Sequence, residues 1–194
     1  MGRATPVLTT KRLTLSAPRA NDADVIFPFV HGEPGRVVTD MLLWDGPASI
    51  EELRDYYEKY VLKEEPDSVE FGWAIRDRAG AITGTPGRPL GSIGARLSIP
   101  PGAAEIGYYL APPYQRRGLM SEAIRTVVSY AFDEWGSSSV RAEVFTGNEA
   151  SQRLLESLGF RNVGTLPEQH EKRGETVDSY GYEVAPGQLR LGSE

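Results

Sequence analysis

The chain contains no cysteine among its 194 residues. It can therefore form no disulfide, present no thiolate nucleophile and offer no sulfur ligand to a metal. An acyl-cysteine intermediate is excluded for the same reason.

Basic residues are outnumbered by acidic ones, 21 to 27, and long apolar runs are absent. The formal net charge is −6, which argues against nucleic acid and anionic membrane surfaces as partners and suits a cationic small molecule or a basic peptide. No apolar run has the length that a bilayer requires, and Met1–Pro6 has no apolar signal core. We therefore expect a cytoplasmic protein with neither nucleic-acid nor membrane partners.

Several motifs of metal and nucleotide chemistry are absent. The sequence has no Walker loop, no G-x-S-x-G and no H-E-x-x-H. Its two histidines, His31 and His170, show no paired ligand spacing, and we interpret them as loop or surface residues. We expect no metal.

The composition, 40% hydrophobic and 25% charged, is typical of a globular protein, and the length suits one domain. Hydrophobic periodicity predicts a single mixed α/β domain over residues 1–194, with a frayed tail after about residue 186. We expect strands at 12–16, 71–76, 90–97, 104–110, 140–145, 160–166 and 177–184.

Four helices are predicted between these strands. The first is short, capped by Asn21 or Asp22, and the second begins at the capping box of Ser49. The second helix places Ile50, Leu53, Tyr57, Tyr60 and Val61 on one face. The third covers 119–132, and the fourth runs from Asn148 until Gly159 ends it. Residues 32–47 look loop-rich, and 77–89 are expected to form a mobile loop.

The segment Tyr114–Ala123 is the most informative part of the chain. It follows the strand at 104–110 and continues into the helix at 119–132. Unpaired N–H groups at a helix start, together with the helix dipole, attract an anion. Gly118 permits φ > 0 and close backbone approach, and Arg116 and Arg117 add positive charge. The pattern favours a phosphate site, although solvated turn arginines are the simpler alternative.

Three pieces in order carry a family resemblance: the strand Glu105–Leu110, the turn Gln115–Met120, and Asn148–Ser151 ahead of Leu158-Gly159-Phe160. The chain resembles the GNAT superfamily of acyl-CoA-dependent N-acyltransferases, and looks most like its RimJ/RimL-like branch of ribosomal-protein alanine acetyltransferases. The opening Thr10–Leu15 and the turn Gly174–Asp178 are similar to that branch too. The resemblance implies an α/β (α+β) fold with a mixed, mostly antiparallel seven-stranded sheet, about four helices and a splay between strands 4 and 5.

Two positions depart from the family pattern. The glycine signature usually ends in Gly or Ala, where this chain has Met120. That side chain either narrows the pyrophosphate turn or points into the core. Many relatives carry a tyrosine, which protonates the departing thiolate, where this chain has Leu155. The RimJ/RimL-like branch suggests Ser151 as the substitute, while a purely structural serine is the alternative.

The resemblance implies a role for each remaining site residue. Glu105 is the candidate base, acting through water, unless it is an ordinary exposed strand carboxylate. A backbone N–H near Tyr108–Leu110 meets the oxyanion, and Asn148 bonds the pantetheine arm or only caps its helix. The implied cofactor-binding residues are Tyr108, Tyr109, Leu110, Gln115, Arg116, Arg117, Gly118, Leu119, Met120, Ser121 and Asn148.

The implied activity is direct acetyl transfer from acetyl-CoA to a primary amine in a ternary complex. The acceptor stays open among a protein N-terminus, a polyamine and an aminoglycoside-like molecule, and the family resemblance allows a homodimer. Trp44, Tyr56, Tyr57 and Trp73 either wall an acceptor pocket or pack in the core. One alternative is an idle acyl-CoA-binding module. Another is a flavin or NAD protein, against which the single glycine of the turn argues, since no G-x-G-x-x-G is present.

Overall fold

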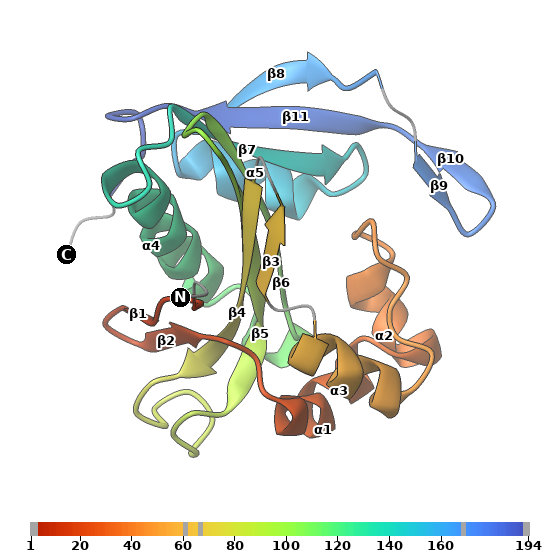
Figure 1. Cartoon of the computed structure of the whole chain (residues 1–194). Helices are drawn as coiled ribbons and strands as arrows, with labels where there is room; N and C mark the ends of the chain where they lie inside the picture. The colour runs from red at the N-terminus through yellow and green to blue at the C-terminus, as the bar shows by residue number, and fades with distance from the viewer. Residues whose placement is uncertain (1–3, 60–61, 66–67, 168–169, 192–194) are drawn as a thin grey trace.

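The computed structural model describes residues 4–59, 62–65, 68–167 and 170–191. In this part of the chain one sheet has the strand order β1-β2-β4-β5-β6-β7-β11-β8, and β3 pairs with β4 (Figure 1). Its strands are β1 (Leu8–Thr9), β2 (Leu13–Ser16), β3 (Leu62–Glu65), β4 (Ser68–Asp77), β5 (Pro89–Ser98), β6 (Ala103–Leu110), β7 (Ser139–Phe145), β8 (Arg161–Thr165) and β11 (Ser179–Val184).

All seven predicted strands are present, and every pairing except β6 with β7 is antiparallel. The predicted mixed, mostly antiparallel fold is therefore confirmed, and the short strands β1 and β3 extend it. The last predicted strand differs at its start. Residues Glu175–Val177 turn away as β10 and pair with β9 (His170–Lys172) in a separate hairpin.

The helices lie on both faces of the sheet (Figure 1). Their bounds are α1 (Ala23–Ile26), α2 (Gly32–Thr39), α3 (Ile50–Lys59), α4 (Leu119–Asp133) and α5 (Glu149–Ser157). Helices α1 to α3 lie together on the face opposite α4 (Figure 1). Tyr60 and Val61, predicted on the apolar face of α3, lie outside the described residues. Within the described residues, no helix is both long enough and apolar enough to cross a bilayer.

Helix α2 corrects the prediction that residues 32–47 are loop-rich. Gly32, Pro34 and Gly35 look like turn signals, but all three belong to the helix. Pro34 lies in the first turn, where its missing N–H has no helical partner to lose. Gly35 is required by space, since a Cβ there would come within 2.4 Å of the Val30 carbonyl carbon.

Two hydrophobic clusters flank the sheet. The larger joins the inward residues of the strands, such as Phe71, Trp73 and Ile93, to the buried face of α4. The smaller lies among α1, α2 and α3 and includes Ile26 and Leu53. The apolar alternation of the strands and the 3.6-residue period of the helices account for both.

Asp22 joins the smaller cluster to the sheet. It occupies the N-cap position of α1, but its side chain makes no cap hydrogen bond there. Both carboxylate oxygens instead accept from the Arg76 guanidinium, at 2.7 and 2.6 Å, and both residues are buried. Removing one partner of such a buried pair leaves an uncompensated charge, so the pair fixes α1 against β4.

Two segments expected to be loose are held by hydrogen bonds. In 77–89, the Asp77 carboxylate accepts from the backbone N–H groups of Gly80, Ile82 and Thr83 at 2.8–2.9 Å. In the tail, Arg190 N–H donates to the Leu158 carbonyl at 2.9 Å. The tail up to residue 191 therefore lies against the end of α5.

The sheet opens between β6 and β7. The parallel pairing covers only Ala103–Glu105 of β6 and Ser139–Arg141 of β7. Beyond these residues the two strands continue without further pairs, so the predicted splay between the fourth and fifth strands is confirmed. The splay exposes one edge of β6 directly ahead of the turn into α4.

Candidate functional site

A cavity of about 1600 Å³ lies at the splay. Its walls come from β6, β7, the start of α4, the start of α5, and the segment from α2 to α3. All the predicted site residues except Arg117 line it: Glu105, Tyr108, Tyr109, Leu110, Gln115, Arg116, Gly118, Leu119, Met120, Ser121, Asn148 and Ser151. The fold therefore gathers in one place residues that the sequence separates by up to 46 positions.

The open edge of β6 can be assigned to particular residues. Ala111 N–H donates across to the Leu90 carbonyl of β5. Because backbone groups alternate sides along a strand, the N–H groups of Tyr108 and Leu110 point away from β5 and into the splay. The Leu110 carbonyl on that side accepts from Gln115 Nε2 at 2.9 Å. Two amide donors thus face the cavity, where an amide-bearing chain can pair with them.

The turn into α4 has the geometry of an anion site. Gly118 is the N-cap, with φ +71°, and no side chain caps the helix. The first helical bond is from Glu122 N–H to the Gly118 carbonyl. The amides of Leu119, Met120 and Ser121 therefore have no acceptor within α4. Arg116 stands beside them with φ +56°, so the chain reverses sharply and presents this side chain at the turn.

Arg12, which directly precedes β2, is a further cation at this turn, and sequence reasoning missed it. Its guanidinium donates to the Arg117 carbonyl at 3.0 Å and to Glu122 Oε2 at 2.7 Å. A Cβ on Gly118 would lie 3.5 Å from it. The hydrogen bonds that Thr10 and Arg12 donate to Glu122 outweigh its burial, so the pKa of this carboxyl lies below its usual value. These bonds anchor the start of α4 to β2.

Met120, the departure from the glycine signature, lies largely in the core. It is buried and belongs to the main hydrophobic cluster. The second of the two sequence-based interpretations is therefore correct. The longer side chain supplies an apolar contact for α4, while its backbone amide stays at the turn.

The start of α5 carries a pair of hydroxyl groups. Asn148 is the N-cap and accepts from Ser151 N–H at 3.1 Å. The Ser151 hydroxyl lies 2.7 Å from the hydroxyl of Tyr108. Burial raises the pKa of Tyr108 to about 12, even though its bond with Ser151 acts in the opposite direction. Leu155, one turn further on, is completely buried and offers no polar group.

Glu105 lies in a row of alternating charge. Its register partners are Arg96 on β5 and Arg141 on β7. The row continues outward to Glu70 and Glu183, and Arg141 Nε donates to Glu183 at 3.0 Å. Glu105 itself is exposed to the cavity, so water can reach it.

A glycine row lies directly beside this charged row. Gly72, Gly94 and Gly107 are register partners on β4, β5 and β6, and all three line the cavity. A Cβ on Gly107 would meet no atom within 4 Å. The glycines therefore leave a strip of bare backbone that leads across the sheet to the splay.

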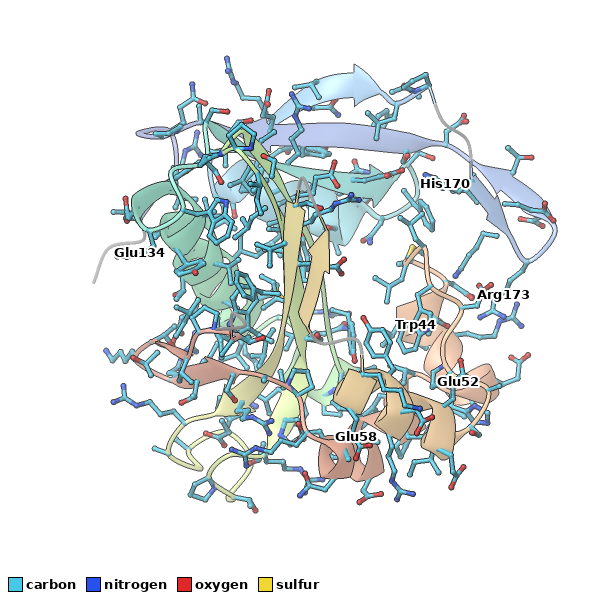
Figure 2. The ribbon with its side chains drawn as sticks, in the orientation of Figure 1. Trp44, Glu52, Glu58, Glu134, His170 and Arg173 are labelled. Carbon is cyan, nitrogen blue, oxygen red and sulfur yellow. The ribbon has the colours of Figure 1, made fainter. Side chains whose placement is uncertain are left out.

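A second acidic group faces the same opening. Glu143 of β7 accepts hydrogen bonds from the Ser179 hydroxyl and pairs with His170 Nε2. The His170 ring also lies 5.9 Å from the Phe145 ring, and Figure 2 shows His170 over the end of β7. His170 is thus a partly exposed residue of β9, as the surface interpretation expected, but it pairs with Glu143. A lone histidine 27 positions from its partner gives no sequence signal for such a pair.

The four candidate wall aromatics separate into two groups. Trp44, Tyr56 and Tyr57 line the cavity. Trp73 does not, since it is fully buried in the main cluster and donates Nε1–H to the Pro6 carbonyl at 2.7 Å. Tyr109 donates a hydrogen bond to Tyr57, and burial raises the pKa of both hydroxyls. In the described residues, no three His, Asp or Glu side chains gather as a metal site would require.

Comparison with known proteins agrees with this geometry. The family model described as "Acetyltransferase (GNAT) domain" matches residues 12–161. YoaA, an uncharacterized N-acetyltransferase of Bacillus subtilis, is 34% identical over 181 residues, which cover 92% of this chain and 96% of YoaA.

Solved structures show the same fold. A GNAT-family acetyltransferase from Bacillus anthracis superposes with a TM-score of 0.74 at 19% identity, covering 93% of this chain and 98% of its own. An acetyltransferase from Salmonella typhimurium that modifies the N-terminal serine of a 50S ribosomal subunit protein also gives a TM-score of 0.74. It is 17% identical and covers 93% of this chain and 99% of its own.

Proposed function

Because the chain belongs to the GNAT family of acetyltransferases, we propose that it moves an acetyl group from acetyl-CoA directly to a primary amine. The observation that carries this proposal is the shared cavity. It contains the open edge of β6, the uncapped start of α4 and the hydroxyl pair of Tyr108 and Ser151. These are the parts needed to bind a thioester, polarise it and accept its leaving group.

The turn at Gly118 would hold the diphosphate of the coenzyme. The amides of Leu119 to Ser121 point toward the anion, and the helix dipole adds positive potential. Arg116 and Arg117 supply the charge, and Arg12 lies close beside them. Asn148 uses its carbonyl oxygen as a helix cap, which leaves its amide nitrogen to donate to the pantetheine arm.

The open edge of β6 would orient and polarise the thioester. Of the free N–H groups of Tyr108 and Leu110, one would donate to an amide of the pantetheine arm and the other to the thioester oxygen. A fixed donor aimed at an oxygen that gains negative charge stabilises the transition state more than the ground state. The strand supplies this donor without rearrangement, because its ladder to β7 has already ended.

The incoming amine must be neutral before it attacks. An α-amine with a pKa of about 7.7–8.0 is roughly one-seventh neutral at pH 7, whereas a lysine-like amine near 10.4 is neutral in about one molecule in 2,500. Glu105 would remove the proton through water, which its exposed position permits. Glu143, with His170 bound to it, is a second group on the same opening that could accept this proton.

Ser151 would donate a hydrogen bond to the departing sulfur. The new bond joins nitrogen to the acetyl carbon, and the bond from that carbon to sulfur breaks. In this step Tyr108 would donate to Ser151, and the serine O–H would then be available to donate to the sulfur. A thiol of pKa about 8.5 leaves as a tolerable thiolate, so a hydrogen bond suffices.

The direct test mixes the protein with acetyl-CoA and a panel of amines and follows the release of free thiol. The chain suits this assay, because a protein without cysteine gives no thiol background. We expect amine-dependent release with at least one acceptor. Tight CoA binding without any turnover would instead indicate the idle acyl-CoA-binding module, which the buried Leu155 favours.

A further inference from the structure

The cavity has one strongly apolar wall, formed by α2, the loop after it and α3. Among the described residues, eight large apolar side chains are exposed, and six of them line this one cavity. Five of the six belong to this wall: Val37, Met41, Leu43, Trp44 and Tyr56. Leu43 is 59% and Trp44 38% exposed. Apolar side chains gathered at a concave site indicate a binding surface.

Ion pairs connect this wall to the β9–β10 hairpin. Lys172, the last residue of β9, donates Nζ–H to the Trp44 carbonyl at 3.0 Å and pairs with Asp45 at 2.6 Å. Arg173 pairs with Asp40 at 2.5 Å. Figure 2 labels Arg173 and Trp44 in the region where the β9–β10 hairpin approaches α2. The loop is thus tied to the β9–β10 hairpin, so the wall is formed before any ligand binds.

The opposite wall is polar and carries charges of both signs, and in the cavity lining five glutamates outnumber three arginines, Arg96, Arg116 and Arg141. Glu105 and Glu143 flank the splay, and Glu70 lies further out on β4. Between the two walls runs the glycine row that ends at Gly107. A ligand that reaches the splay along this strip meets apolar side chains on one side and carboxylates on the other. The site therefore suits a molecule with a cationic end and an apolar body.

We propose that the acceptor is a primary amine borne by an aromatic or bulky aliphatic group, whose body packs on the wall of Met41, Leu43 and Trp44. This inference rests on the proposed acetyl transfer. It selects among the three acceptor classes that the sequence left open. The shared chemistry has two sources: a small arylalkylamine, and a peptide whose first residue is apolar.

Polyamines and aminoglycosides fit the same cavity less well. Their hydroxyl and ammonium groups would lie against side chains that cannot hydrogen-bond to them, and burial of an unpaired polar group is unfavourable. Burying an aromatic side chain on such a wall instead favours binding by about tenfold or more. The carboxylates are placed to attract the amine, and they would disfavour a second acidic copy of this chain as the occupant.

The test compares kcat/KM for phenethylamine, a tripeptide amide beginning with phenylalanine, one beginning with serine, spermidine and kanamycin. We expect one of the two apolar amines to exceed spermidine and kanamycin by about tenfold or more. If phenethylamine leads, the source is a small amine, and if the phenylalanine peptide leads, it is a protein N-terminus. A preference for spermidine or kanamycin would overturn the inference and leave acetyl transfer intact.

Variants then test the wall itself. Leu43→Ser and Trp44→Ala should reduce the preference for apolar amines at least fivefold, with the KM for acetyl-CoA unchanged. Leu191→Ser removes another exposed apolar side chain, which lies outside the cavity, and should change nothing. Sedimentation of Leu43→Ser tests whether a second copy of this chain occupies the wall instead. A changed oligomeric state with unchanged amine preference would contradict the proposal.

A failure of the proposed function can be told apart from a failure of this inference. If no amine is acetylated, calorimetry of phenethylamine and spermidine on the CoA-loaded protein decides the question. Binding of phenethylamine that Leu43→Ser weakens supports an apolar amine site without turnover. Absence of such binding, or tighter binding of spermidine, overturns it.

Discussion

The hydroxyl groups of Tyr108 and Ser151 lie 2.7 Å apart and join β6 to the first turn of α5. Burial raises the pKa of Tyr108 to about 12, so the phenol stays protonated at neutral pH and has a proton to donate to Ser151. The helix position where many relatives carry a tyrosine is Leu155 here, and it is buried. Tyr108 thus supplies a phenol from β6 instead of from α5, and its hydroxyl contacts the hydroxyl of Ser151.

This relationship predicts that Tyr108→Phe lowers kcat by about tenfold or more, within the range of general acid–base effects. The KM for acetyl-CoA should change little, because the backbone donors of β6 remain. Ser151→Ala should have a similar effect. The double variant should be no slower than the slower single variant, since the two hydroxyls act as one unit. Additive losses would show that they act separately.

The choice of base can be decided by a matched pair of variants. Glu105→Gln should lower kcat/KM by about 100-fold at pH 7, with a smaller loss as the pH approaches the pKa of the amine, where a base is needed less. Glu143→Gln, an equivalent change one strand away, should have the smaller effect. The reverse ranking in pH–rate profiles of the two variants would assign the base to Glu143 and His170.

The turn makes a prediction about coenzyme affinity. Arg116 has φ +56°, so Arg116→Gly removes the guanidinium while keeping a residue that tolerates this backbone. We expect calorimetry to show CoA binding weakened about tenfold, with a smaller difference at high salt. Arg54→Ala, on α3 and paired with Asp24, is the control. Unchanged affinity of Arg116→Gly would place the diphosphate elsewhere.

The glycine row predicts a way to block the acceptor without harming the fold. Gly107→Leu places a side chain where a Cβ meets no atom within 4 Å, so the thermal unfolding temperature should be nearly unchanged. The leucine would fill the strip, and we expect kcat/KM for the amine to fall at least tenfold while CoA affinity is retained. Gly107→Ala should show a much smaller loss. Equal activity of the wild-type protein and the two Gly107 variants would show that the acceptor does not lie along this strip.

Two tyrosines with raised pKa values, Tyr57 and Tyr108, predict how stability depends on pH. Burial raises the pKa of both Tyr57 and Tyr108 to about 12, against about 10 in an unfolded chain. Above pH 10 the unfolded chain binds fewer protons than the folded protein, so unfolding becomes easier as the pH rises. Each tyrosine contributes stability that is full below pH 10 and is lost as the pH rises to about 12.

The magnitude is on the order of 1–3 kcal/mol for each tyrosine. Denaturant unfolding at pH 9 and pH 11.5 measures this loss. Tyr57→Phe and Tyr108→Phe should each reduce the difference between the two pH values. A wild-type protein equally stable at both pH values would contradict the assignment.

Most of the fold could be predicted from the sequence, because the signals for strands, helices and turns are local. Alternating apolar residues in 104–110 and 140–145 predict two strands, and the helix at 119–132 has a clear 3.6-residue period. The turn at Gly118 was also predictable, since a glycine between a strand and a helix needs no distant partner. Helix α2 was missed for the same local reason, because Pro34 and Gly35 resemble turn residues until Val30 is seen packed against them.

The sequence by itself determined the order of elements, the absence of any protein thiol and the glycine turn before α4. Only the tertiary structure decided which side chains meet at the splay. It paired Tyr108 with Ser151, placed His170 on Glu143, brought Arg12 to the turn and buried Trp73 while leaving Trp44 on the cavity wall. These contacts join residues 43, 27 and 105 positions apart, and hydrophobic periodicity specifies which face a residue occupies but not which distant residue that face will meet.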